Sequence, residues 1–291
     1  MNRLLLRCLL PALVAGALVA AGCGSGTAAS SPQAQEIALD TRADSMAMRI
    51  YEAHGGPKVW RDVPALAFSF AVGQVAGGDT TRRKVARHWW RRTDGMYRVE
   101  WSASSDSAYT AVFDVDAFDL GAGSSEALPG QALLNGTRLD SAAERRALRR
   151  AGTRFANDTY WLLAPLKLFD DGVNRSVDPM PAPPDSGRPA LHLNFDQVGI
   201  THEDRYWMVP DSASGRLGRW AFSLQGMSPQ QRPGVFRWTG YETFATPAGS
   251  LALSTRKVNA GGSRVIYTDE VRIPATLPDS LFSIERVEDG E

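Results

Sequence analysis

Histidine side chains are the first candidates for catalytic or metal-binding residues, because an imidazole can act as an acid, a base or a metal ligand near neutral pH. The chain has four of them: His54, His88, His192 and His202. No two are three or four residues apart and no H-E-x-x-H motif occurs, so the spacing of a helix-borne metal site is missing. His192 stands between two leucines in an alternating run, so we expect it to face away from the core. His54 precedes Gly55 at a predicted helix end, where a protonated imidazole would complement the helix dipole. The sequence predicts no metal and no cofactor.

Other patterns match known motifs by letter but not by expected geometry. Residues 254–257 read S-T-R-K, like the S-x-x-K motif of penicillin-recognising enzymes, but on a strand a spacing of three puts the serine and lysine on opposite faces. The aspartates of 114–119 imitate a calcium loop, yet Asp119 stands where the sharp turn requires glycine. The acids at 170–171 and the H-E-D at 202–204 are typical of solvated turns. We therefore expect no catalytic residues and a protein that is not an enzyme.

The first 22 residues have the pattern of a secretory signal peptide. Arg3 and Arg7 precede an apolar run over 9–21, which is too short to span a membrane as a helix. Residues 1–22 are therefore expected to be a signal peptide.

Small residues at 20–22 lead directly into Cys23. This pattern resembles the lipobox of bacterial lipoproteins, which implies that Cys23 carries a lipid and anchors the chain to a membrane. Gly24, rather than Asp, follows the cysteine, which by the same resemblance favours the outer membrane, facing the periplasm, over the inner one. The alternative is an ordinary signal peptide with an incidental cysteine.

Composition excludes several classes of function. Cys8 would leave with the signal and Cys23 would carry the lipid, so the folded part has no cysteine for a disulfide, a thiolate metal site or a nucleophile. Removing residues 1–22 removes two Arg and no acid, which leaves 30 basic and 32 acidic residues and a formal charge of −2. A nearly neutral chain is not attracted to nucleic acid by its overall field, and we expect a monomer without a nucleic-acid partner.

Periodicity divides the rest of the chain. Residues 23–39 are small and polar and predict a flexible tether, followed by a single domain over 40–291. Spacings of three and four predict one helix from Asp40 or Thr41 to about His54 and a second over 140–163. A proline-rich loop at 178–189 cannot lie inside a sheet.

Between and after the helices, apolar residues alternate with polar ones, which predicts half-buried strands. The alternating sets are 66–72, 97–101, 191–195, 206–208, 220–224, 236–238, 251–253 and 265–267. Short turns between them favour antiparallel hairpins. The sequence predicts an α+β fold, mainly antiparallel β, in which about nine to eleven strands form one curved sheet or unclosed half-barrel with helices packed on its concave side.

Three stretches together resemble a known family. They are EAHGGPKVW (52–60), NDTYWLLAPLKLFDDGV (157–173) and VGITHEDRYWMVPDSASGRLGRW (198–220). They resemble a family of bacterial envelope lipoproteins of unknown function and, more distantly, the LolA/LolB type of lipoprotein carrier. The resemblance spans about residues 40–285 and implies an unclosed antiparallel β-barrel with helices in its mouth. The chain departs from the family pattern at four positions: Ala164, Leu166, Phe169 and Asp171.

Large apolar side chains exceed what a thin sheet and two helices need for a core. The candidates for binding a ligand are Phe68, Phe70, Trp101, Tyr160, Trp161, Leu163, Trp207, Trp220 and Trp238. Basic clusters at 82–92 and 144–155 could contact anionic lipid head groups, but we favour the simpler interpretation that they form an ordinary solvated surface.

These features predict a lipid-anchored, non-enzymatic envelope protein that binds an acyl chain, a lipid or a lipoprotein in the concavity of its half-barrel. The alternative is a closed core whose surface binds an envelope protein partner as an interaction or signalling module.

Overall fold

The computed structural model describes residues 37–118, 128–196, 203–228 and 230–284. The predicted signal peptide, Cys23 and most of the tether lie outside these residues, as do Asp119 and His202. The predictions made for those positions stay predictions.

Thirteen strands form one antiparallel sheet within the described residues. The first group is β1 (Ala65–Ala76), β2 (Asp79–Arg91), β3 (Met96–Ser104), β4 (Ser107–Asp114), β5 (Gln131–Leu134) and β6 (Thr137–Arg138). The second group is β7 (Val173–Pro179), β8 (Pro189–Phe195), β9 (Arg205–Pro210), β10 (Leu217–Ser223), β11 (Gly234–Thr246), β12 (Gly249–Asn259) and β13 (Arg264–Arg272). The predicted single antiparallel sheet is confirmed. The count exceeds the prediction because short strands such as β6, with two residues, are too short to show alternation.

The order of strands shows that the sheet is not closed. It runs β6-β5-β4-β3-β2-β1-β13-β12-β11-β10-β9-β8-β7, so β6 and β7 are its two edges. Neighbouring strands are consecutive in sequence except at one place, where β1 pairs with β13. There Val72 lies opposite Ile266 and Phe70 opposite Thr268. This one long-range pairing makes a single half-barrel of two separate meanders.

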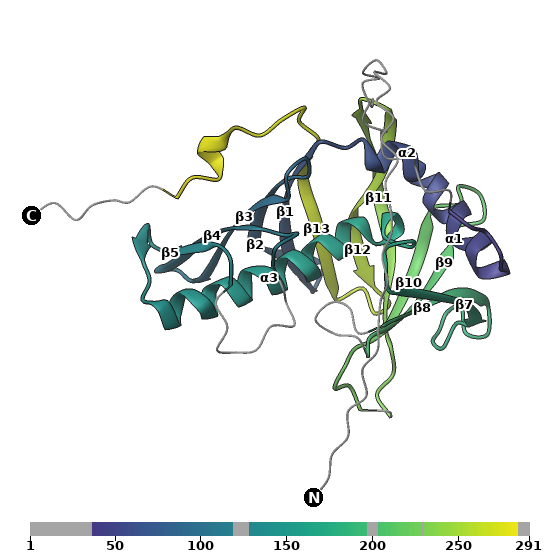
Figure 1. The fold of residues 1–291 in the computed structure, drawn as a ribbon. Coiled ribbons are helices and arrows are strands. Elements are labelled where there is room, and N and C mark those ends of the chain that lie inside the picture. Colours follow the sequence, from purple (N-terminus) through teal and green to yellow (C-terminus); the bar gives the residue numbers. More distant parts are fainter. Residues whose placement is uncertain (1–36, 119–127, 197–202, 229, 285–291) are drawn as a thin grey trace, which may run out of the picture. The chain divides into compact units, whose positions relative to one another are not determined.

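Three helices lie on one face of the sheet, which we call the helix face. They are α1 (Arg42–Ala53), α2 (Gly56–Arg61) and α3 (Ser141–Leu163), and two short 3-10 turns follow at η1 (Ala164–Leu166) and η2 (Asp279–Leu281). The two predicted helices are confirmed as α1 and α3. Of the two predicted starts of the first helix, Thr41 is the cap and accepts from the Asp44 amide, while Asp140 at the start of α3 accepts from the amides of Ala142 and Ala143. α3 crosses the sheet from β5 towards β12 (Figure 1).

The H-G-G of the family-like segment forms the sharp turn between α1 and α2. Gly55 and Gly56 both have positive φ, +122° and +80°. A Cβ on Gly55 would lie 2.7 Å from the Ser250 carbonyl oxygen, so the turn approaches β12 too closely for a side chain. The His54 carbonyl then accepts from the Ala252 amide at 3.2 Å. These two glycines therefore fix the helices against the sheet.

The opposite face of the sheet is covered by chain without regular structure. Met180 and Ala182 of the proline-rich loop pack against β8, β9, β10 and β11. Near the C-terminal end, Leu277 and Phe282 pack against Ala65 and Val112. Residues 180–188 thus lie outside the sheet and protect part of its second face, whereas Asp178, Pro179 and Pro189 pair at the ends of β7 and β8, so the prediction is wrong for the ends of the segment.

Lys257, on β12, is fully buried in the middle of the sheet. Its Nζ donates to the Ser254 carbonyl at 2.6 Å and to Thr268 Oγ1 at 2.8 Å, and it lies 4.8 Å from the centre of the Trp238 ring. Burial lowers the pKa of this amine well below its usual value. The Ser254 hydroxyl donates to the Thr239 carbonyl instead of facing the amine, so the S-x-x-K pattern forms no reactive pair.

Replacing Lys257 with Met should raise stability and flatten its pH dependence. In the wild type the unfolded chain binds this proton up to about pH 10.5, whereas the folded protein loses it at lower pH, so stability rises as pH approaches that value. Lys257→Met should remove this slope and add about 1 kcal/mol or more to the free energy of unfolding at pH 7.

Urea unfolding of the soluble Cys23→Ser protein from pH 7 to pH 10 measures both effects. Lys84→Met, at a half-exposed lysine paired with Glu270, serves as the control and should leave the slope in place. A Lys257→Met protein that is less stable at pH 7 and keeps the full slope would contradict the prediction.

Candidate functional site

A large cavity lies on the helix face. It has a volume of about 730 Å³ and is enclosed by the second half of α3, the chain following η1, and strands β8, β9 and β10. Ligand sites typically have volumes of about 300–1,000 Å³. The lining residues of α3 include Arg150, Arg154, Asn157 and Trp161, which are three or four positions apart, so one face of the helix is turned towards the cavity.

Six aromatic residues form the inner wall of this cavity. They are Tyr160, Trp161, Phe195, Tyr206, Trp220 and Phe222. The ring centres of Trp161 and Trp220 are 4.6 Å apart, those of Tyr206 and Trp220 are 5.0 Å apart, and Trp161 meets Phe222 edge to face at 6.0 Å. Rings at these separations and tilts support one another, so the wall is preformed. Two of its donors, Tyr160 Oη and Trp220 Nε1, are buried without a hydrogen-bond partner among the described residues.

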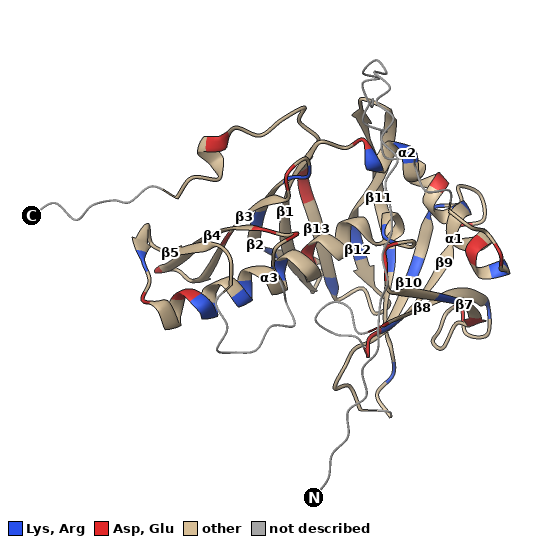
Figure 2. Ribbon diagram, in the orientation of Figure 1, with Lys and Arg blue, Asp and Glu red and all other residues tan. Residues whose placement is uncertain are grey.

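Charged residues of both signs also line the cavity, with basic residues mostly on α3 and acids mostly towards β7 and β9, although Asp158 lies beside Arg154 and Lys167 beside Asp170. Arg150 and Arg154 stand on α3, where Figure 2 shows basic residues along the helix. The acids Asp170, Asp171 and Asp204 lie towards β7 and β9. Lys167 pairs with Asp170 at 2.6 Å, while Asp204 accepts from the Tyr206 hydroxyl at 2.7 Å and from the Gln225 amide at 2.7 Å. The cavity therefore combines an apolar wall with a basic side and an acidic side.

A buried polar network ties this wall to β2 and β3. Asp158, on α3, is 2% exposed and accepts from Asn157 Nδ2 at 2.7 Å. Its Oδ2 lies 3.5 Å from Arg154 Nη1 and 3.2 Å from His88 Nε2, the latter without the alignment of a hydrogen bond. On the far side of the imidazole, Nδ1 lies 2.8 Å from the Tyr97 hydroxyl. Burial is the main influence on the pKa of His88 and lowers it, so the ring is neutral. Its Nδ1 then accepts a hydrogen bond from the Tyr97 hydroxyl. His88 and Tyr97 do not line the cavity, and the network positions α3.

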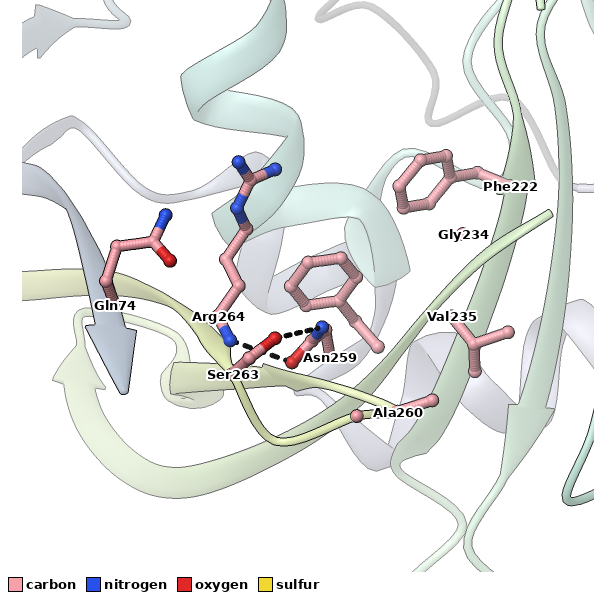
Figure 3. Close-up of a pocket in the computed structure, with 10 residues that line it drawn as sticks. Gln74, Phe222, Gly234, Val235, Asn259, Ala260, Ser263 and Arg264 are labelled. Carbon is pink, nitrogen blue, oxygen red and sulfur yellow. Dashed lines mark hydrogen bonds between the residues drawn. The ribbon is translucent and has the colours of Figure 1, made fainter. Parts of the chain in front are cut away.

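A smaller cavity of about 410 Å³ lies beside the first. It is lined by the start of β11 and the turn between β12 and β13, with Gln74 and Arg264 across from Phe222 (Figure 3). Asn259 accepts from the Arg264 amide at 2.8 Å and closes this turn. Phe222 lines both cavities, and its ring lies so close to Gly234 that a Cβ there would be 2.5 Å from it.

The nine residues predicted to bind a ligand are divided among different places. Tyr160, Trp161 and Trp220 line the large cavity. The others are packed elsewhere: Phe68, Phe70 and Leu163 beneath the helices, Trp238 in the adjoining cluster, Trp101 stacked on Tyr109, and Trp207 on the opposite face stacked on His192. Phe195, Tyr206 and Phe222 also line the cavity and were not among the candidates. Alternation identifies them as facing the helices but does not indicate which positions the helices leave uncovered.

The structure agrees with the prediction for His192 and differs from the prediction for His54. His192 lies on the opposite face from Leu191 and Leu193, as predicted, and its Nδ1 is 2.6 Å from Asp178. His54 lies at the end of α1, as predicted, but the expectation that it is protonated there is wrong. It is 1% exposed, its Nδ1 donates to the Ile50 carbonyl at 2.7 Å, and burial lowers its pKa to about 4. The close approach of the turn to β12 encloses the ring and keeps it neutral.

The basic cluster at 82–92 forms most of β2, and among the described residues four of its charges, on Arg82, Lys84, Arg87 and Arg91, are paired with acids. Lys84 Nζ lies 2.8 Å from Glu270 Oε1, Arg91 Nη2 lies 2.6 Å from Asp94, and Arg82 pairs with Asp269. Such cross-strand pairs are what a solvated sheet surface carries, which supports the simpler interpretation of this cluster.

The described residues contain neither a metal-binding cluster of side chains nor a helix that could span a membrane. No group of three or more His, Cys, Asp or Glu side chains in those residues could hold a metal ion. Of the helices in the described ranges, none is both long and apolar enough to cross a bilayer.

The fold defines the class of protein as an α+β half-barrel with helices on one face. No protein-family model matches the chain, and no curated protein matches its sequence. Two similar solved structures are a DUF1329 family protein from Desulfovibrio piger and an "outer membrane lipoprotein-sorting protein domain" from Vibrio parahaemolyticus. Each match covers 82% of this chain and 95% of the other, with identities of 9% and 8% and TM-scores of 0.43 and 0.38. At these levels of similarity neither structure assigns a ligand or a function to this chain.

Removing the Asp158 carboxylate should destabilise the protein. Arg154 is only 16% exposed and would lose its one carboxylate partner among the described residues. Breaking such a mostly buried pair from one side costs about 3 kcal/mol, so we expect Asp158→Ala to lower the free energy of unfolding by about that amount. Urea unfolding followed by tryptophan fluorescence provides the measurement.

Asp171→Ala, at an exposed acid of the same rim, is the matched control and should change stability by less than 0.5 kcal/mol or so. A loss for Asp158→Ala no larger than that of the control would show that the network does not hold α3 in place.

Proposed function

We propose that this protein is a lipid-anchored, non-enzymatic component of the bacterial envelope whose half-barrel binds an acyl chain or a similar amphiphile. The observation that carries the proposal is the cavity of about 730 Å³ beneath α3, whose lining combines a cluster of aromatic rings with charged and polar residues. A binding site for an amphiphile requires that arrangement, because the chain gains free energy by leaving water while the polar end stays hydrated.

The location within the cell rests on the sequence. The charged start, short apolar run and small residues before Cys23 are the pattern of an exported, lipid-modified chain. The tether that follows would let the domain reach away from the membrane surface to which Cys23 holds it. An anchored domain with an amphiphile site would meet its ligand at that surface.

The non-enzymatic part of the proposal rests on how the polar groups near the cavity are used. Asp158 is engaged by Asn157 and Arg154, and Lys167 is engaged by Asp170. The neutral His88 is enclosed behind the wall rather than exposed to the cavity. These groups serve positioning and charge balance, which is what a binding site needs.

Filling part of the cavity should weaken ligand binding strongly without unfolding the protein. Ala156 of α3 lines the cavity, so Ala156→Trp places an indole in the space that the ligand would occupy. We expect the soluble Cys23→Ser protein to bind a fluorescent fatty acid and to carry amphiphile detectable by lipid-extract mass spectrometry, and Ala156→Trp to lower the probe affinity by roughly tenfold or more.

Ala142→Trp, at an exposed position in the first turn of α3, is the control and should bind the probe like the parent. The proposal fails if the parent protein contains no amphiphile and binds no fatty-acid probe.

A further inference from the structure

Arg154 has donors that no protein group uses. Its side chain is 16% exposed and lines the large cavity. Its nearest carboxylate, on Asp158, lies 3.5 Å from Nη1, at the outer limit of a hydrogen bond. Nε is buried and has no acceptor among the described residues. A guanidinium offers five N–H groups in a fixed plane, so this one can still bind an acceptor from the cavity side.

The charges around Arg154 favour an anion. Arg150 stands one turn earlier on the same stripe of α3 and also lines the cavity. Both Arg150 and Arg83 contribute to lowering the Arg154 pKa through their charge, although burial contributes most. Three guanidiniums therefore act on this corner, and Asp158 balances one of them. Like charges four apart on a helix repel one another, and a bound anion relieves that repulsion.

The acids of the rim do not compensate this excess, because they lie elsewhere. Asp204 accepts hydrogen bonds from the Tyr206 hydroxyl and the Gln225 amide, and Asp170 is paired with Lys167. An anionic group entering the cavity is thus drawn towards the arginines and away from the opposite side. The separation of charges orients the ligand.

We propose that the ligand is an amphiphile with an anionic head group, which Arg150 and Arg154 bind while its chain lies along Trp161, Trp220 and Phe222. From Arg150 to Trp161 the helix rises about 16 Å, so the head group and the chain have separate places on one stripe of α3. This inference rests on the proposed function and adds the chemistry of the head group to it.

The test compares ligands that differ only in the head group. The soluble Cys23→Ser protein is titrated with oleate, with oleyl alcohol and with oleoyl lysophosphatidate, below their aggregation concentrations. We expect both anions to bind roughly tenfold more tightly than the alcohol, since a hydrogen bond to a charged group contributes about that factor. Whichever of the two anions binds with higher affinity shows whether the site prefers a carboxylate or a phosphate head group.

Substitutions then assign the effect to the two arginines. Arg150→Gln and Arg154→Gln should each weaken the binding of the anions about fivefold to tenfold and leave oleyl alcohol unchanged. Arg150 is exposed, so its variant keeps the fold even if Arg154→Gln proves unstable. Arg146→Gln, at an exposed arginine of α3 outside the cavity lining, is the matched control and should change nothing.

The outcomes distinguish a failure of the head-group inference from a failure of the proposed function. If the alcohol binds as tightly as the anions, or if both arginine variants bind the anions like the parent, the head-group inference is wrong while the apolar site stands. If none of the three ligands binds, the proposed function itself is wrong.

Discussion

The antiparallel pairing of β1 with β13 is the interaction on which the rest of this structure depends. Each meander, β1 to β6 and β7 to β13, is built from neighbouring hairpins that close short loops. Only the β1–β13 ladder joins strands separated by nearly the whole domain, and it places Val72 opposite Ile266 and Phe70 opposite Thr268. Because loop closure over this distance is entropically costly, the ladder must be supported by burial of the residues around it.

That support comes from α3 and from the α1–α2 turn. α3 contacts β3, β4 and β5 on one side and β12 on the other, so it spans the joint between the two meanders. Leu162 and Leu163 at its end share one core cluster with Phe68 and Leu253, while Gly55 brings α1 and α2 directly onto β12. The buried link from Asp158 towards His88 and Tyr97 fixes the rotation of α3. Rotation of this helix decides which of its side chains face the cavity.

The cavity follows from how unevenly the helices cover the sheet. α1 packs on β7 and β8, and α3 on β3 to β5 and on β12, so the helix face of β9 and β10 is covered by aromatic side chains instead of backbone. Rings such as Trp161 and Trp220 are too rigid to fill such a space completely. The same stripe of α3 that ends in Trp161 begins in Arg150, which gives the cavity an apolar end and a basic end.

Much of this architecture could be predicted from the sequence, and the site much less. Alternation of period two assigned Leu191, Tyr206 and Phe222 to one face of strands, and Thr41 and Asp140 marked the helix starts, because each of these signals depends only on near neighbours. Of the nine aromatic and aliphatic candidates, three line the cavity. Which of the inward-facing residues are covered, the burial of His54 and Lys257, and the meeting of Asp158 with His88 depend on segments brought together by the β1–β13 ladder and the path of α3. Tertiary structure decided these features, because burial and charge balance at a residue are set by groups distant in the chain.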